Sequence, residues 1–109
     1  MRLSELEAEL LKISPGGYQM VDSLADAQGV MFLCPKCYKE NKGRVGTHMV
    51  ICWFRNKGVP DETFPRPGRW NPKGTSLEDL TFVGPEACSV LLNGGGCGWH
   101  GYVQDGSAE

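Results

Sequence analysis

Residues 30–37 read Val30-Met31-Phe32-Leu33-Cys34-Pro35-Lys36-Cys37, an apolar run that leads directly into two cysteines. The apolar run predicts a strand, and the proline after Cys34 predicts a turn. Two cysteines separated by two residues can offer both sulfurs to one tetrahedral metal ion, and the amides of the turn can donate hydrogen bonds to the thiolates. The segment therefore predicts a metal site at the end of a strand.

A second motif of the same spacing, Cys97-Gly98-Trp99-His100, follows near the end of the chain among several glycines. Together the two motifs supply three thiolates and one imidazole, a donor set typical of structural zinc. We therefore predict one structural Zn²⁺ per chain, held by Cys34, Cys37, Cys97 and His100. Four protein ligands leave no open position for water, which argues against metal-assisted hydrolysis.

Two other interpretations of the first motif are a redox pair and two unliganded buried thiols. A thioredoxin-like pair needs a helix that starts at the motif within a βαβ unit, and residues 39–43 favour a helix only weakly. The other candidates for the metal are Cys88, the best substitute ligand, and His48, which we expect at the surface or in the core. Cys52 lies within a predicted strand and is expected to be a small buried hydrophobe.

The rest of the chain predicts one N-terminal helix followed by strands. Leu3, Leu6, Leu10 and Ile13 recur at helical spacing, which predicts a helix over residues 3–13. The prediction is thus a helix in residues 1–14 and a β-rich zinc-binding domain in residues 18–106, within a single domain. Strands are expected at residues 30–33, 47–54, 80–83, 89–92 and 99–103, with a turn at 105–106 and a frayed tail. The fold class is a small β-rich α+β domain with antiparallel strands, stapled by zinc.

Composition restricts the setting of the protein. The chain has 109 residues, which is the size of one domain, and no apolar run approaches the roughly 20 residues needed to cross a bilayer. Its start is acidic and amphipathic and lacks the apolar core of a secretory signal. Five cysteines, an odd number, favour metal binding in a reducing compartment over a disulfide framework. We therefore expect a cytoplasmic protein without membrane contact.

Basic residues are concentrated in the middle of the chain. Residues 36–73 hold nine basic and three acidic side chains, although the whole chain has a net charge of −2. Within this part, residues 55–79 are rich in proline and glycine and predict a long irregular loop. The loop is either a lid on the core or a contact surface, and the candidate contact residues are Trp53, Phe64, Arg69 and Trp70.

Four pieces of sequence occur in an order that resembles a known type of protein: residues 32–37, 50–54, 67–70 and 97–103. The pattern resembles small proteins encoded by tailed phages and prophages, and it is similar to zinc-ribbon-like domains of the DUF6527 type. The resemblance covers Val30 to Gly106 and leaves out the N-terminal segment. It implies a zinc-binding protein of phage type, found in the host cytoplasm or the virion.

The sequence favours a non-enzyme. A catalytic serine or cysteine needs a free base, and the only histidines are His48 and His100, one of them assigned to zinc. We therefore expect no catalytic residue and a protein-interaction module with a protein partner, acting as a virion or assembly accessory or as an inhibitor of a host system. The alternative is a nucleic-acid binder that uses the basic segment 36–73 and stacks bases on Tyr38, Trp53, Phe54 and Trp70.

Overall fold

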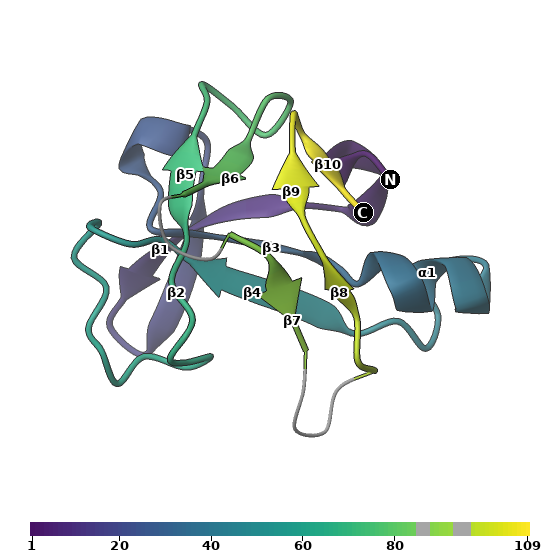
Figure 1. The fold of residues 1–109 in the computed structure, drawn as a ribbon. Helices are drawn as coiled ribbons and strands as arrows, with labels where there is room; N and C mark the ends of the chain where they lie inside the picture. The colour runs from purple at the N-terminus through teal and green to yellow at the C-terminus, as the bar shows by residue number, and fades with distance from the viewer. Residues whose placement is uncertain (85–87, 93–96) are drawn as a thin grey trace.

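The computed structural model describes residues 1–84, 88–92 and 97–109. Its largest element is a four-stranded antiparallel sheet of order β2-β1-β3-β4 (Figure 1). The strands are β1 (Glu9–Ser14), β2 (Gly17–Val21), β3 (Gly29–Leu33) and β4 (Met49–Trp53). The described residues include one α-helix, α1 (Pro35–Asn41). The prediction of a small β-rich fold with antiparallel strands and one helix is confirmed.

The single α-helix does not lie at the N-terminus, so the prediction of a helix over residues 3–13 is wrong. Leu3–Leu6 form only a 3-10 turn, η1, which ends where Glu7 adopts a left-handed conformation (φ 54°). The chain then enters β1, an interior strand of the sheet, in which Leu10 and Leu11 are both buried. A strand buried on both faces has apolar neighbours in sequence, and this pattern imitates the spacing of an amphipathic helix.

The sequence predicted to stop the helix instead closes a β-hairpin. Ser14 pairs with Gly17, so Pro15 and Gly16 form the two-residue turn between β1 and β2. Gly16 has φ +83°, the conformation that a turn with proline before glycine requires. Residues 9–14 therefore belong to the sheet, and residues 1–14 do not form a separate helical segment.

Three short antiparallel pairs lie over one face of the sheet (Figure 1). They are β5 (Asn71–Lys73) with β6 (Thr81–Val83), β7 (Val90–Leu91) with β8 (His100–Gly101), and β9 (Val103–Gln104) with β10 (Ser107–Ala108). A second 3-10 turn, η2 (Leu24–Asp26), joins β2 to β3. The core lies between the layers, where Val30, Phe32 and Val50 of the sheet pack with residues of the pairs such as Phe82 and Val103.

Most of the predicted strands are present, and the predicted tail is not frayed. The turn at Asp105 and Gly106 is confirmed, with φ values of 47° and 75° that suit a two-residue hairpin. Ser107 and Ala108 then form β10, and the Ala108 amide donates to the carbonyl of Met1 at 2.8 Å. The two termini consequently lie side by side (Figure 1).

Candidate metal centre

Four potential metal ligands converge at one end of the sheet. One ligand atom from each of Cys34, Cys37, His48 and Cys97 lies within 4.8 Å of all the others. The Sγ atom of Cys97 is 3.5 Å from the Sγ of Cys34 and 3.5 Å from Nε2 of His48. A tetrahedral ion with Zn–S bonds of about 2.3 Å separates its ligand atoms by about 3.8 Å. The spacing of the group therefore suits a tetrahedral metal ion.

The hairpin of β3 and β4 brings two of the ligands together. Leu33 lies opposite Met49, and one residue further the Cys34 amide donates to the His48 carbonyl at 2.9 Å. The ligand pair Cys34 and His48 thus continues the antiparallel register past the end of both strands. Antiparallel neighbours in such a pair have side chains close enough to share one ion.

The helix and the C-terminal segment supply the other two ligands. Cys34 is the N-cap of α1, so Cys37 lies in the first turn of the helix and its side chain returns toward the cap. Pro35 occupies the first helical position, where its missing N–H costs no hydrogen bond. Cys97 approaches from the segment before β8, and Lys36 donates from Nζ to its carbonyl at 3.2 Å. Three distant parts of the chain therefore meet at this centre.

The fourth residue of the group is His48, whereas the sequence predicts His100. His100 lies in β8 opposite Leu91, is exposed, and stacks on Tyr102 with a ring separation of 6.4 Å. Its neighbour Trp99 points into the core, edge-on to Phe32 at 6.0 Å. Because side chains alternate along an extended segment, an inward Trp99 turns His100 away from the sulfurs. The hairpin register is the sequence signal that could have identified His48.

The His48 ring is oriented for metal binding. Its Nδ1 lies 3.2 Å from the carbonyl oxygen of Met49, and a proton on Nδ1 donates to that oxygen. In this tautomer the lone pair of Nε2 is directed at the cysteine group and can bind a metal ion, whereas without a metal ion a proton on Nε2 can donate to the Cys97 sulfur. A ligand histidine whose second nitrogen donates to a carbonyl is the usual arrangement at metal sites.

The electrostatics of the three thiols differ sharply. Desolvation raises the pKa of Cys97, but hydrogen bonds from His48, from the Trp99 amide and from the other two thiols outweigh it and lower the pKa to about 6. Desolvation and the hydrogen bond with Cys97 raise the pKa of Cys37 to about 12. Desolvation likewise raises the pKa of Cys34. A metal ion that binds all three sulfurs must therefore displace protons from Cys34 and Cys37.

The structure has one feature of a thioredoxin-like redox pair and lacks two others. A helix does start at the motif, contrary to the expectation for residues 39–43. However, β3 and β4 on either side of it are antiparallel, so the βαβ unit is absent from this part of the chain. The first cysteine of a redox pair has a lowered pKa, whereas burial raises the pKa of Cys34. All five cysteines have free thiols.

The two remaining cysteines lie outside the group. Cys52 is fully buried on the core side of β4, in agreement with the prediction of a small buried hydrophobe, and burial raises its pKa. Cys88, the predicted substitute ligand, is half-buried and packs against the core. The residue that joins the three cysteines in place of His100 is therefore His48 and not Cys88.

Of the four candidate contact residues, one side chain is largely exposed. Trp53 is 2% exposed and donates from its indole to the Phe64 carbonyl at 2.7 Å. Trp70 stacks on Phe82 at 5.8 Å and donates to the Ser89 carbonyl at 3.0 Å. The Phe64 ring is 71% exposed. The loop therefore packs Trp70 onto the core like a lid and leaves Phe64 at the surface.

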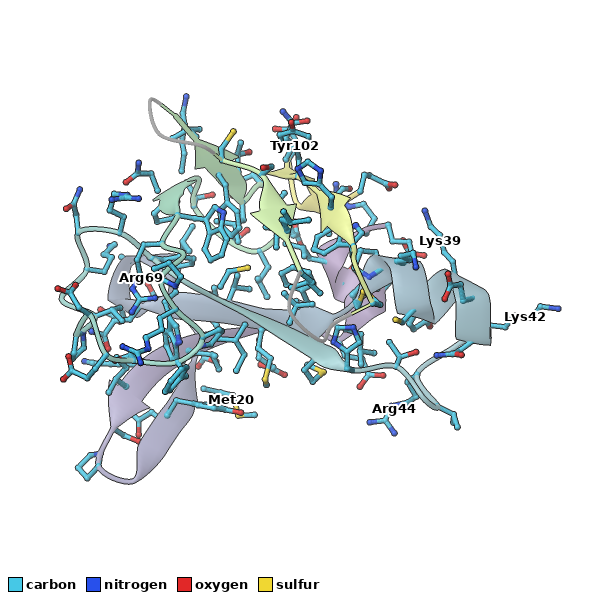
Figure 2. The ribbon with its side chains drawn as sticks, turned by 60° about the horizontal axis from the view of Figure 1, so that its bottom comes forward. Met20, Lys39, Lys42, Arg44, Arg69 and Tyr102 are labelled. Atoms are coloured by element: carbon cyan, nitrogen blue, oxygen red, sulfur yellow. The ribbon has the colours of Figure 1, made fainter. Side chains whose placement is uncertain are left out.

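Arg69 has a structural position inside the loop. Its guanidinium donates to five backbone carbonyls at 2.8–3.4 Å. The acceptors are Pro60, Asp61, Thr63, Pro65 and Gly68. Figure 2 shows Arg69 among the side chains of this loop, away from the basic residues around α1. Its side chain is therefore engaged within the chain.

The stacking residues proposed for nucleic-acid binding are also distributed unevenly. Phe54 is 1% exposed and Trp53 is 2% exposed, so both rings are buried. Tyr38 and Trp70 are half-buried and pack against the core. Two of the four rings therefore have no face open to a base.

Comparison with known proteins adds no relative. No family model, no curated protein and no solved structure matches the chain. Among the described residues, no helix is long and apolar enough to cross a membrane.

Proposed function

We propose that this chain is a structural-zinc domain that acts without catalysis, as a module that binds another protein. The observation that carries the proposal is the approach of Cys34, Cys37, His48 and Cys97 to within 4.8 Å. Three thiolates and an imidazole favour zinc over magnesium or calcium, because soft ligands prefer softer ions.

A structural role for the zinc follows from the number and origin of its ligands. Four protein ligands complete the tetrahedron, so no position is left for a water or a substrate. The ligands come from the end of β3, the start of α1, the start of β4 and the segment before β8. An ion bound there ties the C-terminal part of the chain to the main sheet. A chain of 109 residues gains much from such a staple, since its core is small.

Exposed apolar side chains support the binding role. Tyr18 and Met20 of β2 and Met49 of β4 are 43%, 59% and 39% exposed. Their register places them on the sheet face opposite the core, with the half-buried Met31 and Ile51 between them. Met20 projects from β2 in Figure 2. Methionine-rich apolar surfaces adapt to protein partners, and this is where we place the binding role. A phage-type protein, in the virion or directed at a host system, fits the resemblance in sequence.

The zinc proposal is tested by a matched pair of histidine variants. We expect the purified chain to contain one zinc per chain, His48→Ala to lose zinc and stability, and His100→Ala to keep both. Metal analysis and thermal unfolding measure these outcomes. Zinc retained in His48→Ala but lost in His100→Ala would restore the ligand set predicted from the sequence.

The binding role is tested by affinity capture with the immobilised, zinc-loaded chain. We expect a protein to be retained by the wild type and lost with Met20→Lys, which leaves the core face unchanged. The second candidate function is nucleic-acid binding, favoured by the exposed Lys39, Lys42 and Arg44 around the end of α1 (Figure 2). Binding of single-stranded or duplex DNA that weakens steeply between 50 and 200 mM salt would favour that candidate, since phosphate contacts are salt-dependent.

A further inference from the structure

A groove runs along the outer edge of β4. It has a volume of about 540 Å³ and is lined by residues 48–51 at the start of β4, residues 65–68 and Trp70 of the long loop, and residues 89–92 around β7. Val50 faces the core and Met49 and Ile51 face the opposite side of the sheet, yet all three line the groove. The groove therefore lies along the strand edge and not on either face of the sheet.

The hydrogen bonds of β4 show which of its backbone groups face the groove. The Phe54 amide donates to the Gln28 carbonyl, and the Cys34 amide donates to the His48 carbonyl, so even-numbered residues pair with β3. On the other side, the Trp53 carbonyl accepts from the Trp70 amide at 3.1 Å. Backbone groups alternate in direction along an antiparallel strand. The N–H and C=O groups of Met49 and Ile51 therefore point outward, into the groove.

The Met49 carbonyl lies 3.2 Å from His48 Nδ1, and the other outward groups, the Met49 N–H and both backbone groups of Ile51, have no partner in the described part of the chain. Among the described residues, the backbone of the neighbouring loop pairs with the end of this strand at the parallel bridge between Phe54 and Trp70. Before Trp70 the chain contains Pro65 and Pro67, which have no N–H to donate to a ladder. The proline-rich loop thus leaves the edge of Met49 and Ile51 open, and an open strand edge is a template for another extended chain.

The walls of the groove define the chemistry of an occupant. They are mostly apolar, and Leu91 is 52% exposed there. Arg66 contributes the only full charge among the described lining residues, none of which is acidic. Its guanidinium lies 4.6 Å from the Phe64 ring centre and has no carboxylate partner among the described side chains. A carboxylate on the occupant would complement this cation.

We propose that the open edge of β4 binds an extended segment of a partner protein by β-strand addition. The backbone of the segment pairs with Met49 and Ile51, its apolar side chains contact the groove walls, and an Asp or Glu faces Arg66. Main-chain hydrogen bonds supply affinity in this mode, and the side chains on alternate positions supply specificity. The inference rests on the proposed protein-binding role and extends its site from the exposed sheet face to the adjoining edge of β4, with which that face shares Met49 and Ile51.

The test uses a random heptapeptide display library selected on the immobilised, zinc-loaded chain. We expect selected peptides to alternate β-branched residues with polar ones and to contain an Asp or Glu. Synthetic copies carrying one N-methyl group at a time report the backbone pairing. Methylation at every second amide should weaken binding at least tenfold, because those amides face β4, and methylation of the amides between them should have little effect.

Charge reversal provides the test on the protein. Arg66→Glu should weaken binding of the acidic peptide at least tenfold and select Lys- or Arg-bearing peptides instead, with zinc content unchanged. Lys57→Glu, an equal charge change elsewhere in the loop, is the matched control and should bind as the wild type does. The inference is wrong if N-methylation has no alternating effect along the peptide. It is also wrong if Arg66→Glu binds the acidic peptide as tightly as the wild type does. If affinity capture still recovers a partner with Arg66→Glu, the binding role stands and only this location fails.

Discussion

Two regions of this chain are each organised around one point where several contacts meet. They differ in how far apart in the sequence the connected segments lie. At the candidate metal centre, four side chains from distant parts of the sequence converge on a site for one ion. In the long loop, the single guanidinium of Arg69 binds five carbonyls within ten residues of chain. The first centre joins the layers of the fold, whereas the second shapes one loop.

The comparison teaches which kind of cross-link a sequence reveals. Metal ligands are side chains of a few types, so their spacing can be recognised in the sequence. The acceptors of Arg69 are backbone carbonyls, which every residue has, so no residue pattern marks them. The same difference predicts the energetics, because an ion that links distant segments is coupled to folding of the whole chain.

The largest effect is expected from removing one metal ligand. Cys37→Ser should lose zinc and the cooperative unfolding transition, because a structural zinc site is coupled to folding. Chelation of zinc from the wild type should have the same result. Metal analysis and unfolding followed by circular dichroism measure both effects. Cys88→Ser, a change of the same size at a half-buried thiol outside the group, is the control and should keep zinc. An equally stable, zinc-free Cys37→Ser protein would remove the distinction between the two centres.

A smaller, local effect is expected at the loop. Arg69→Ala should lower the free energy of unfolding by about 2–3 kcal/mol, because several hydrogen bonds from a charged donor are lost while water replaces some of them. Zinc content should stay unchanged. Arg69→Lys should recover only part of the loss, because an ammonium group lacks the planar fork of donors. Chemical denaturation with zinc analysis on the same samples makes the measurement. Loss of zinc in Arg69→Ala would show that the two centres are coupled.

The same difference between spacing in the sequence and contacts made by folding explains which parts of the fold and the site could be predicted. The grouping of the three cysteines and the strand before them could be predicted, because the cysteines occur at a recognisable spacing and the strand is continuously apolar. The fourth member of the group could not be read from motif spacing, since pairing between strands brings His48 to Cys34 and His48 is not close to Cys97 in the sequence. The helical spacing of Leu3, Leu6, Leu10 and Ile13 misled the prediction, because a strand buried on both faces, as β1 is at Leu10 and Leu11, loses the alternation that identifies strands.

The smallest effect is expected in the same loop, at Asp79. Its carboxylate accepts hydrogen bonds from the amides of Ser76 and Thr75 at 2.9 and 2.8 Å and from the Thr75 hydroxyl at 2.9 Å. These bonds, first that from the Ser76 amide, lower the pKa of Asp79 below its ordinary value. A carboxyl group with a lowered folded-state pKa stabilises the fold above its unfolded-state pKa, and this contribution is lost as the pH falls through the folded-state value.

Asp79→Asn should therefore make the loss of stability on acidification shallower, while the stability at neutral pH falls only slightly. The amide side chain keeps an oxygen that can accept from the Ser76 and Thr75 amides but has no charge to titrate. Thermal unfolding between pH 3 and 7 measures the difference. The control is Asp61→Asn, because the Asp61 carboxylate lies in the same loop and forms no hydrogen bond among the described residues. Parallel stability curves for Asp79→Asn and the wild type across this range would show that the carboxylate contributes no pH-dependent stability to the loop.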